Sequence, residues 1–287
     1  VSVVSGASSD GAGGDVEIAV GSGTSGIGGS LSLGSGSATT GGDVDLFSAS
    51  TDTGATGDVV LRTGSSGYGQ TGNLVLATGD AVGDQPGSLL FVLGSGDSGN
   101  GGDIDLTAGH AYGKSSSGGD ITVAGGNSIE TLVNTAGGDI SVFGGDAFSL
   151  SGGNINLKTG SSTLSSSGNI VVATANAGVS GAAGEIVFST GQSSGGSSGA
   201  ITLHTASGNT GGSGGNIDIA VGTGDSGNGG SVKLSSGFTD VDGFAGGPMT
   251  FEAGGSLGSG SDGGAFMIAG GVSSDQYGGN MAVFSGE

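Results

Sequence analysis

The stretch Asp103-Ile104-Asp105-Leu106 alternates polar and apolar side chains, follows two glycines and precedes a segment rich in glycine and serine. Alternation with a period of two is typical of a half-buried β-strand. The pattern recurs along the chain, for example at Asp120–Val123 and Asp139–Val142, from nineteen starts that are roughly evenly spaced. A register held over 287 residues indicates a repeat fold rather than a disordered chain.

The repeat length predicts the architecture. Successive starts such as Asp43, Asp58 and Asn73 are about fifteen residues apart, which is too short for a strand–helix repeat or a propeller blade. This length suits one coil in which each strand pairs with its equivalent one turn away, and glycines on both sides of the strand allow the tight corners. We therefore expect an all-β fold, a single-stranded parallel β-solenoid (β-helix) of about 18 coils with a thin, flattened cross-section. It should form one continuous domain over residues 1–287.

The alternation also predicts a core. In each repeat the apolar pair should point inward and be nearly fully buried, because a slip of one residue would expose every member of the set. The set includes Val16, Ile18, Val44, Leu46, Ile121, Val123, Ile217 and Ile219. Some outward positions are apolar as well and predict a surface that a partner covers. They are Val60, Val75, Leu90 and Val92 in one patch, and Val171, Ala173 and Val187 in another.

Composition excludes several classes of protein. The 73 glycines argue against a helical enzyme domain, because glycine destabilises helices. Collagen is excluded by the presence of only 2 prolines and the lack of a three-residue period. The absence of cysteine excludes a disulfide scaffold. Four Lys and Arg residues oppose 25 Asp and Glu residues, a net charge of -21. So acidic a chain repels nucleic acid and anionic membrane surfaces, and no apolar run is long enough for a transmembrane helix. We expect neither nucleic acid as a partner nor membrane insertion.

Repeats such as Gly222-Thr-Gly-Asp-Ser-Gly-Asn-Gly-Gly-Ser-Val-Lys-Leu234 resemble the Gly/Ser-rich β-solenoid repeats of large secreted and cell-surface proteins of diatoms and related algae. The resemblance extends over essentially the whole chain. It implies an extracellular, cell-surface or cell-wall location, and it brings no catalytic residues with it.

Catalytic motifs are weak in this sequence. Gly191-Gln-Ser193-Ser-Gly195 has the spacing of a nucleophile elbow, but it lies in a return segment, and His110 and His204 are the two histidines that could act as bases. Polysaccharide lyases and hydrolases with β-helical folds need acids clustered with basic groups. The basic residues here are scattered; they are Arg62, Lys114, Lys158 and Lys233. We therefore expect no enzymatic activity.

The acidic residues suggest a metal site. Carboxylates recur at the first position of the repeat and at a neighbouring outward position, and Ca²⁺ prefers such oxygen ligands. The candidate ligands are Asp103, Asp105, Asp120, Asp139, Asp43, Asp45 and Asp58. The alternative is that these residues cap corners by accepting backbone N–H bonds, since Asn and Ser share the first position. No cofactor is required under that alternative.

A column of threonines recurs near the end of the motif, at Thr63, Thr78, Thr159, Thr174, Thr190 and Thr205. Regular threonine arrays are a feature of ice-binding solenoids. Strand alternation places this column on the inward side, where it would pack small side chains. Packing is the preferred interpretation, and ice binding is the alternative.

Together these features predict an extracellular structural or adhesive fibre or matrix protein. It would act as a mechanical rod that associates with its own kind end to end or laterally, with extracellular polysaccharide or matrix as a further partner. Both ends, Val1–Val4 and Val283–Glu287, carry repeat sequence without a cap, which predicts a segment of a longer solenoid or end-to-end stacking. The alternative functions are a Ca²⁺-dependent adhesion module and an ice-binding solenoid.

Overall fold

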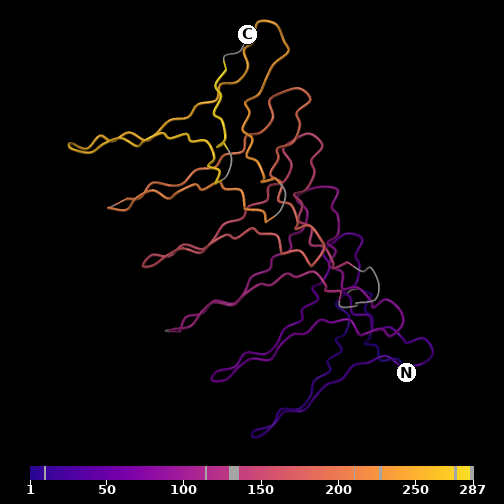
Figure 1. Cartoon of the computed structure of the whole chain (residues 1–287). Coiled ribbons are helices and arrows are strands. Elements are labelled where there is room, and N and C mark those ends of the chain that lie inside the picture. The colour runs from indigo at the N-terminus through magenta and orange to yellow at the C-terminus, as the bar shows by residue number, and fades with distance from the viewer. Residues whose placement is uncertain are drawn as a thin grey trace. The chain divides into compact units, whose positions relative to one another are not determined.

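The structure is a computed structural model that describes residues 1–9, 11–113, 115–128, 136–209, 211–225, 228–274 and 277–284. The described residues contain no α-helix and no β-strand, and Figure 1 accordingly draws neither. The chain divides into two units, Val1–Val142 and Phe143–Glu287. Each unit is built from the same local element, which is described below.

The predicted all-β parallel β-solenoid is therefore wrong for the described part of the chain. A solenoid needs backbone hydrogen bonds between one repeat and the next. The backbone hydrogen bonds of the described residues instead join groups of the same repeat. Even the bond with the widest separation in sequence, from Gly138 to Gly126, stays inside the repeat that begins at Asp120. The repeats thus close on themselves locally, and their extended segments form no sheet.

The predicted core is wrong as well. None of the described residues is buried, and Val16 and Ile121, from the set expected inside, are 51% and 57% exposed. The chain presents 28430 Å² of accessible surface, whereas a folded monomer of this mass presents about 10,600 Å². The physical reason is that the described residues contain no second layer: an extended segment buries its apolar side chains only when another element packs against them.

The alternation itself is visible in the structure. Leu89, Phe91 and Leu93 are less exposed than Leu90 and Val92, which lie between them. Ile170 and Val172 are likewise less exposed than Val171. In these two motifs the side chains expected outside are thus more exposed than those expected inside. The residues expected to form outward apolar patches are all exposed, but so are the residues expected inside, so the assignment of the patches to one side stays a prediction; they are Val60, Val75, Leu90, Val92, Val171, Ala173 and Val187.

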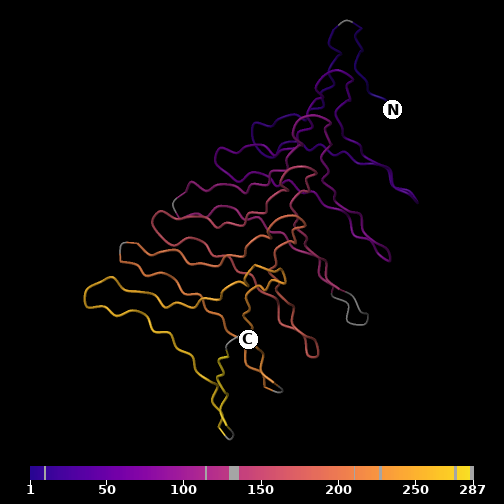
Figure 2. The same cartoon turned by 90° about the horizontal axis from the view of Figure 1, so that it is seen from above.

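Between the end of one motif and the start of the next, the chain runs outward, turns and runs back. We call this segment an excursion, and two small residues lie at its base. We count positions from the first residue of each motif, so that Asp139 is position 1 and Gly145 is position 7. The last residue before the next motif, such as Gly153, is the closing glycine, and it is glycine in all eighteen excursions of the sequence. Figures 1 and 2 show from two directions that the arms of narrow excursions run side by side.

A backbone hydrogen bond fastens the base of many excursions. The closing glycine donates its N–H to the carbonyl of position 7, at N···O distances of 2.8 to 3.2 Å. In the first motif, Val1 is counted as position 2, so that Gly6 is position 7. The bonds run from Gly14 to Gly6, Gly42 to Gly36, Gly119 to Gly109, Gly138 to Gly126, Gly153 to Gly145, Gly168 to Gly160, Gly247 to Gly237, Gly264 to Gly254, and Gly279 to Gly271. We call each of these bonds a closing bond.

The lengths of these excursions follow a rule. In every closing bond the sequence numbers of the donor and the acceptor differ by an even number, although the excursions differ in length. Where the tip is described, the chain bends midway between the two glycines, for example at Phe148–Leu150 in the excursion closed by Gly153 and at Val241–Gly243 in the one closed by Gly247. The difference in sequence number is even when the two arms of an excursion face each other across a tip of fixed length. Each residue added to one arm must then be matched by a residue in the other arm, so the excursion grows by two residues at a time.

In several excursions a Cβ on the closing glycine would come too close to the position-6 side chain or, where position 6 is itself glycine, to the backbone of position 7. A Cβ on Gly230 would lie 2.7 Å from Val221 Cγ1, and one on Gly184 would lie 3.2 Å from Thr174 Cγ2. Position 6 is also the most protected place in the repeat. The half-buried residues of the described chain all occupy it; they are Ser48, Ala108, Gly125, Gly144, Thr159 and Ala253.

Candidate interaction surface

The predicted calcium ligands all lie exposed on the chain. They are Asp43, Asp45, Asp58, Asp103, Asp105, Asp120 and Asp139. Within the described residues, no three or more histidines, cysteines or carboxylates converge on a point where they could hold a metal ion. Asp105 accepts a hydrogen bond of 3.0 Å from the hydroxyl of Thr107. The exposure of these aspartates tests neither the calcium site nor the corner caps, so both stay predictions.

The nucleophile-elbow motif forms the tip of an excursion. Ser193 Oγ accepts a hydrogen bond of 2.9 Å from the backbone N–H of Gly196, across the bend at Ser194–Gly196. The hydroxyl thus stabilises a turn. Thr51, Ser66 and Ser162 have the same relation to the residue three positions on. This position-9 hydroxyl was not recognised in the sequence, although its recurrence two residues after the small residue at position 7 was a usable signal.

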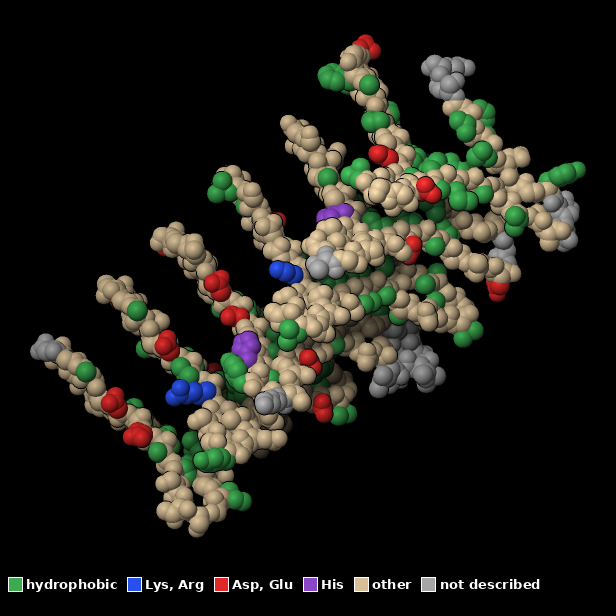
Figure 3. Space-filling view, turned by 90° about the vertical axis from the view of Figure 1, so that its left-hand side faces the viewer, with side chains coloured by type: hydrophobic (Ala, Val, Ile, Leu, Met, Phe, Trp, Pro, Cys, Tyr) green, Lys and Arg blue, Asp and Glu red, His purple; other side chains and the backbone are tan. Residues whose placement is uncertain are grey.

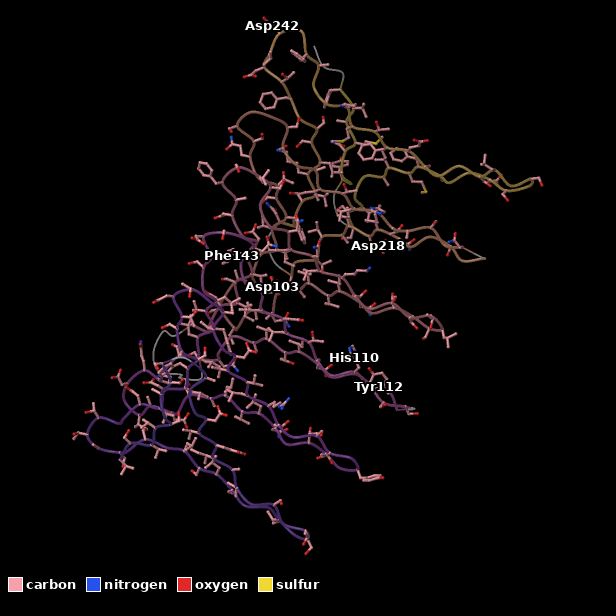
Figure 4. The ribbon with its side chains drawn as sticks, turned by 180° about the vertical axis from the view of Figure 1, so that it is seen from behind. Asp103, His110, Tyr112, Phe143, Asp218 and Asp242 are labelled. Carbon is pink, nitrogen blue, oxygen red and sulfur yellow. The ribbon has the colours of Figure 1, made fainter. Side chains whose placement is uncertain are left out.

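The two histidines are separate from this serine in the sequence and are exposed. His110 lies on a narrow excursion with Tyr112, and their ring centroids are 6.5 Å apart (Figure 4). The described residues enclose no pocket. Lys114, one of the four basic residues, lies outside the described residues, as do Ser285–Glu287 at the C-terminal end.

The threonine column lies against the closing glycines. Each threonine of the column occupies position 6, and its side chain lies within 4 Å of the place that a Cβ on the closing glycine would take. The threonines are Thr63, Thr78, Thr159, Thr174, Thr190 and Thr205. Thr205 also donates a hydrogen bond of 3.0 Å from Oγ1 to the carbonyl of Gly215, its closing glycine. The glycine that precedes every motif from Asp15 onward was expected from the sequence to form a corner, and its backbone hydrogen bond to position 7 was not predicted.

The most extensive surface feature is apolar. Large hydrophobic side chains at positions 2 and 4 are exposed throughout the described residues, and green side chains are visible between the excursions in Figure 3. Two such side chains of consecutive motifs lie close together: the rings of Phe251 and Phe266 have centroids 6.1 Å apart. Positions 2 and 4 therefore form a periodic row of apolar groups in contact with solvent.

Comparison of the chain with protein families, with curated proteins and with solved structures found no match. The described residues form no helix with the length and apolarity needed to cross a membrane.

Proposed function

We propose that the chain is a non-catalytic structural or adhesive element of an extracellular fibre or matrix, and that it works by associating with copies of itself. The observation that supports this most directly is the exposure of every described large apolar side chain at positions 2 and 4. Burying one such side chain contributes about 1.5–3 kcal/mol. A chain that leaves so many in water gains stability when a partner covers them.

A second copy is a partner that matches this surface within each unit. The apolar groups recur with the spacing of the repeat, as from Val59 to Leu74 and from Leu74 to Leu89, and a copy of the chain carries the same spacing. The extracellular location is supported by the Gly/Ser-rich composition and by the resemblance to secreted repeat proteins. Antibody labelling of intact cells, before and after permeabilisation, tests that location.

Sedimentation velocity over a range of protein concentrations tests the association. We expect the weight-average sedimentation coefficient to rise with concentration for the natural chain. Replacing Leu89, Phe91 and Leu93 together by serine should weaken the rise, because three apolar groups are lost. The matched control, Leu89→Val, Phe91→Leu and Leu93→Val, keeps the repeat apolar and should associate like the natural chain. A natural chain that stays monomeric at every concentration would overturn the proposed function.

A further inference from the structure

One motif of the first unit, Ser88–Leu93, differs from the others because it carries large apolar side chains without interruption. In the sequence no other motif has five large apolar residues in a row. Motifs that are also uncharged interrupt the run with a smaller residue, as Ala173 does in the motif that begins at Asn169. The five residues are Leu89, Leu90, Phe91, Val92 and Leu93, and all of them are exposed.

Both sides of this motif are open to a partner. The chain runs from Gln85 to Gly96 without a turn or bend, so neighbouring side chains of the motif point to opposite sides. Leu90 and Phe91, which are such neighbours, are 79% and 66% exposed. A segment laid beside this motif therefore meets apolar side chains on both sides at once.

The backbone of the motif is as open as its side chains. None of the backbone hydrogen bonds found among the described residues involves Ser88–Leu93. An extended segment with unpaired N–H and C=O groups is a template on which another extended chain can pair. The closing bonds use position 7 and the closing glycine, so pairing at positions 1 to 6 leaves them intact.

Charge does not oppose a close approach at this motif. Residues 85–96 carry no charge, and the nearest charged residues, Asp84 and Asp97, each lie four residues beyond an end of the motif. Pro86 precedes the motif by two residues and has no N–H to donate, which limits how far a paired segment can extend. An uncharged run of β-branched, aromatic and aliphatic residues is typical of segments that pair between chains.

We propose that Ser88–Leu93 is the segment through which two copies of the chain pair, the segment of one copy lying edge to edge against the same segment of the other. The best partner is extended, uncharged and apolar on both sides, and within this sequence the same segment of a second copy matches it most fully. Its backbone groups then form hydrogen bonds between copies, and each apolar side chain gains an apolar neighbour across the pair. The inference rests on the proposed function, the association of like chains, and assigns its main contact to one motif.

Hydrogen exchange followed by NMR tests the pairing directly. In a dilute sample, where the chain is monomeric, the amides of Leu89–Leu93 should exchange freely. At concentrations where the chain associates, every second amide of this motif should exchange at least about tenfold more slowly, because one edge of an extended segment bonds to its partner. The amides of the motif Ala200–Leu203, which has polar Thr202 on one side, should change much less.

Proline substitutions test the role of the backbone. Leu90→Pro and Phe91→Pro remove neighbouring N–H groups, which point to opposite edges, so at least one of them should weaken association about tenfold in sedimentation equilibrium. Thr202→Pro and Leu203→Pro are the matched controls at positions 3 and 4 of another motif, and both should associate like the natural chain.

Serine substitutions test the second apolar side. Leu90→Ser combined with Val92→Ser removes two exposed apolar groups from this motif, and it should weaken association. Val60→Ser combined with Val75→Ser removes two exposed apolar groups from neighbouring motifs of the same unit, and it should have a much smaller effect. Circular dichroism of every dilute variant should match that of the natural chain, because the substituted side chains are exposed.

Three outcomes would overturn pairing through Ser88–Leu93. They are equal weakening by the proline variants and their controls, equal weakening by the two serine pairs, and protection of a second motif to the same extent. Protection of Leu89–Leu93 that does not change with concentration would place the contact inside one chain and would overturn it as well. In all these cases a natural chain that still associates leaves the proposed function standing. A natural chain that never associates contradicts the proposed function itself.

Discussion

The backbone N–H of Gly153 donates a hydrogen bond of 2.8 Å to the carbonyl oxygen of Gly145, and the chain bends at Phe148–Leu150 midway between them. This relationship is the structural unit of the protein. It closes an excursion through a contact inside one repeat, and the same bond recurs in other excursions of the described chain.

The first prediction concerns the closing glycine. A Cβ on Gly153 would lie 2.9 Å from the backbone nitrogen of Gly145, so Gly153→Ala should break the closing bond. We expect the amide of residue 153 to exchange with solvent about tenfold faster, corrected for intrinsic rates, in hydrogen exchange followed by NMR. Gly145→Ala is the control, because a Cβ there meets nothing within 4 Å. Equal exchange of the residue-153 amide in both variants would show that the contact between the new Cβ and the Gly145 nitrogen does not affect the closing bond.

The second prediction concerns the even spacing of the bonded glycines. Inserting one serine on each side of Phe148–Leu150 lengthens both arms equally, and the closing bond should persist. Inserting a single serine lengthens one arm only and should remove the bond, because the donor and the acceptor no longer face each other. The measurement is the protection of the closing-glycine amide. A protected amide after the single insertion would contradict the symmetric excursion.

The third prediction concerns the tip hydroxyl. Ser193→Ala removes the acceptor of the 2.9 Å hydrogen bond from Gly196 N–H, so this amide should lose protection by a few-fold. Ser194→Ala, which changes the neighbouring side chain of the same bend, is the control. If both substitutions leave the Gly196 amide unchanged, the serine does not stabilise the turn.

The fourth prediction concerns salt. Copies with a net charge of -21 repel each other, and raising NaCl from about 0.01 M to about 0.15 M shortens the Debye length from about 30 Å to about 8 Å. We expect association, measured by light scattering, to strengthen over this range. CaCl2 at the same ionic strength distinguishes screening from bound calcium, because screening alone makes the two salts nearly equivalent. Association that weakens with salt would contradict the charge argument.

The fifth prediction concerns Ile121, which is exposed in the single chain. Ile121→Asp should leave the far-ultraviolet circular dichroism of the dilute chain unchanged, because the isoleucine has no core to leave. It should weaken association more than Thr122→Asp, which adds the same charge at the neighbouring outward position. Loss of the circular dichroism signal in Ile121→Asp alone would instead show that Ile121 is buried.

Much of the local organisation could be predicted from particular residues. The alternation at Leu89–Leu93 predicted a two-sided extended segment, and the structure shows that modulation of exposure. The prediction of a buried core at Val16 and Ile121 was wrong, because alternation reports which side chains share a side and not whether another element covers that side. The closing bond at Gly145 and Gly153 was missed because a glycine-rich return segment was interpreted as a corner.

The sequence by itself determined the repeat, the net charge of -21 and the zero net charge of residues 147–217, because these are properties of residue order. Only the tertiary structure decided which backbone groups pair. A short repeat of this kind is compatible both with bonds to the next repeat and with bonds inside one repeat, and the structure contains the second kind, such as Gly153 to Gly145. The physical reason is that side-chain alternation follows from local backbone geometry, whereas hydrogen-bond partners depend on which segments meet in space.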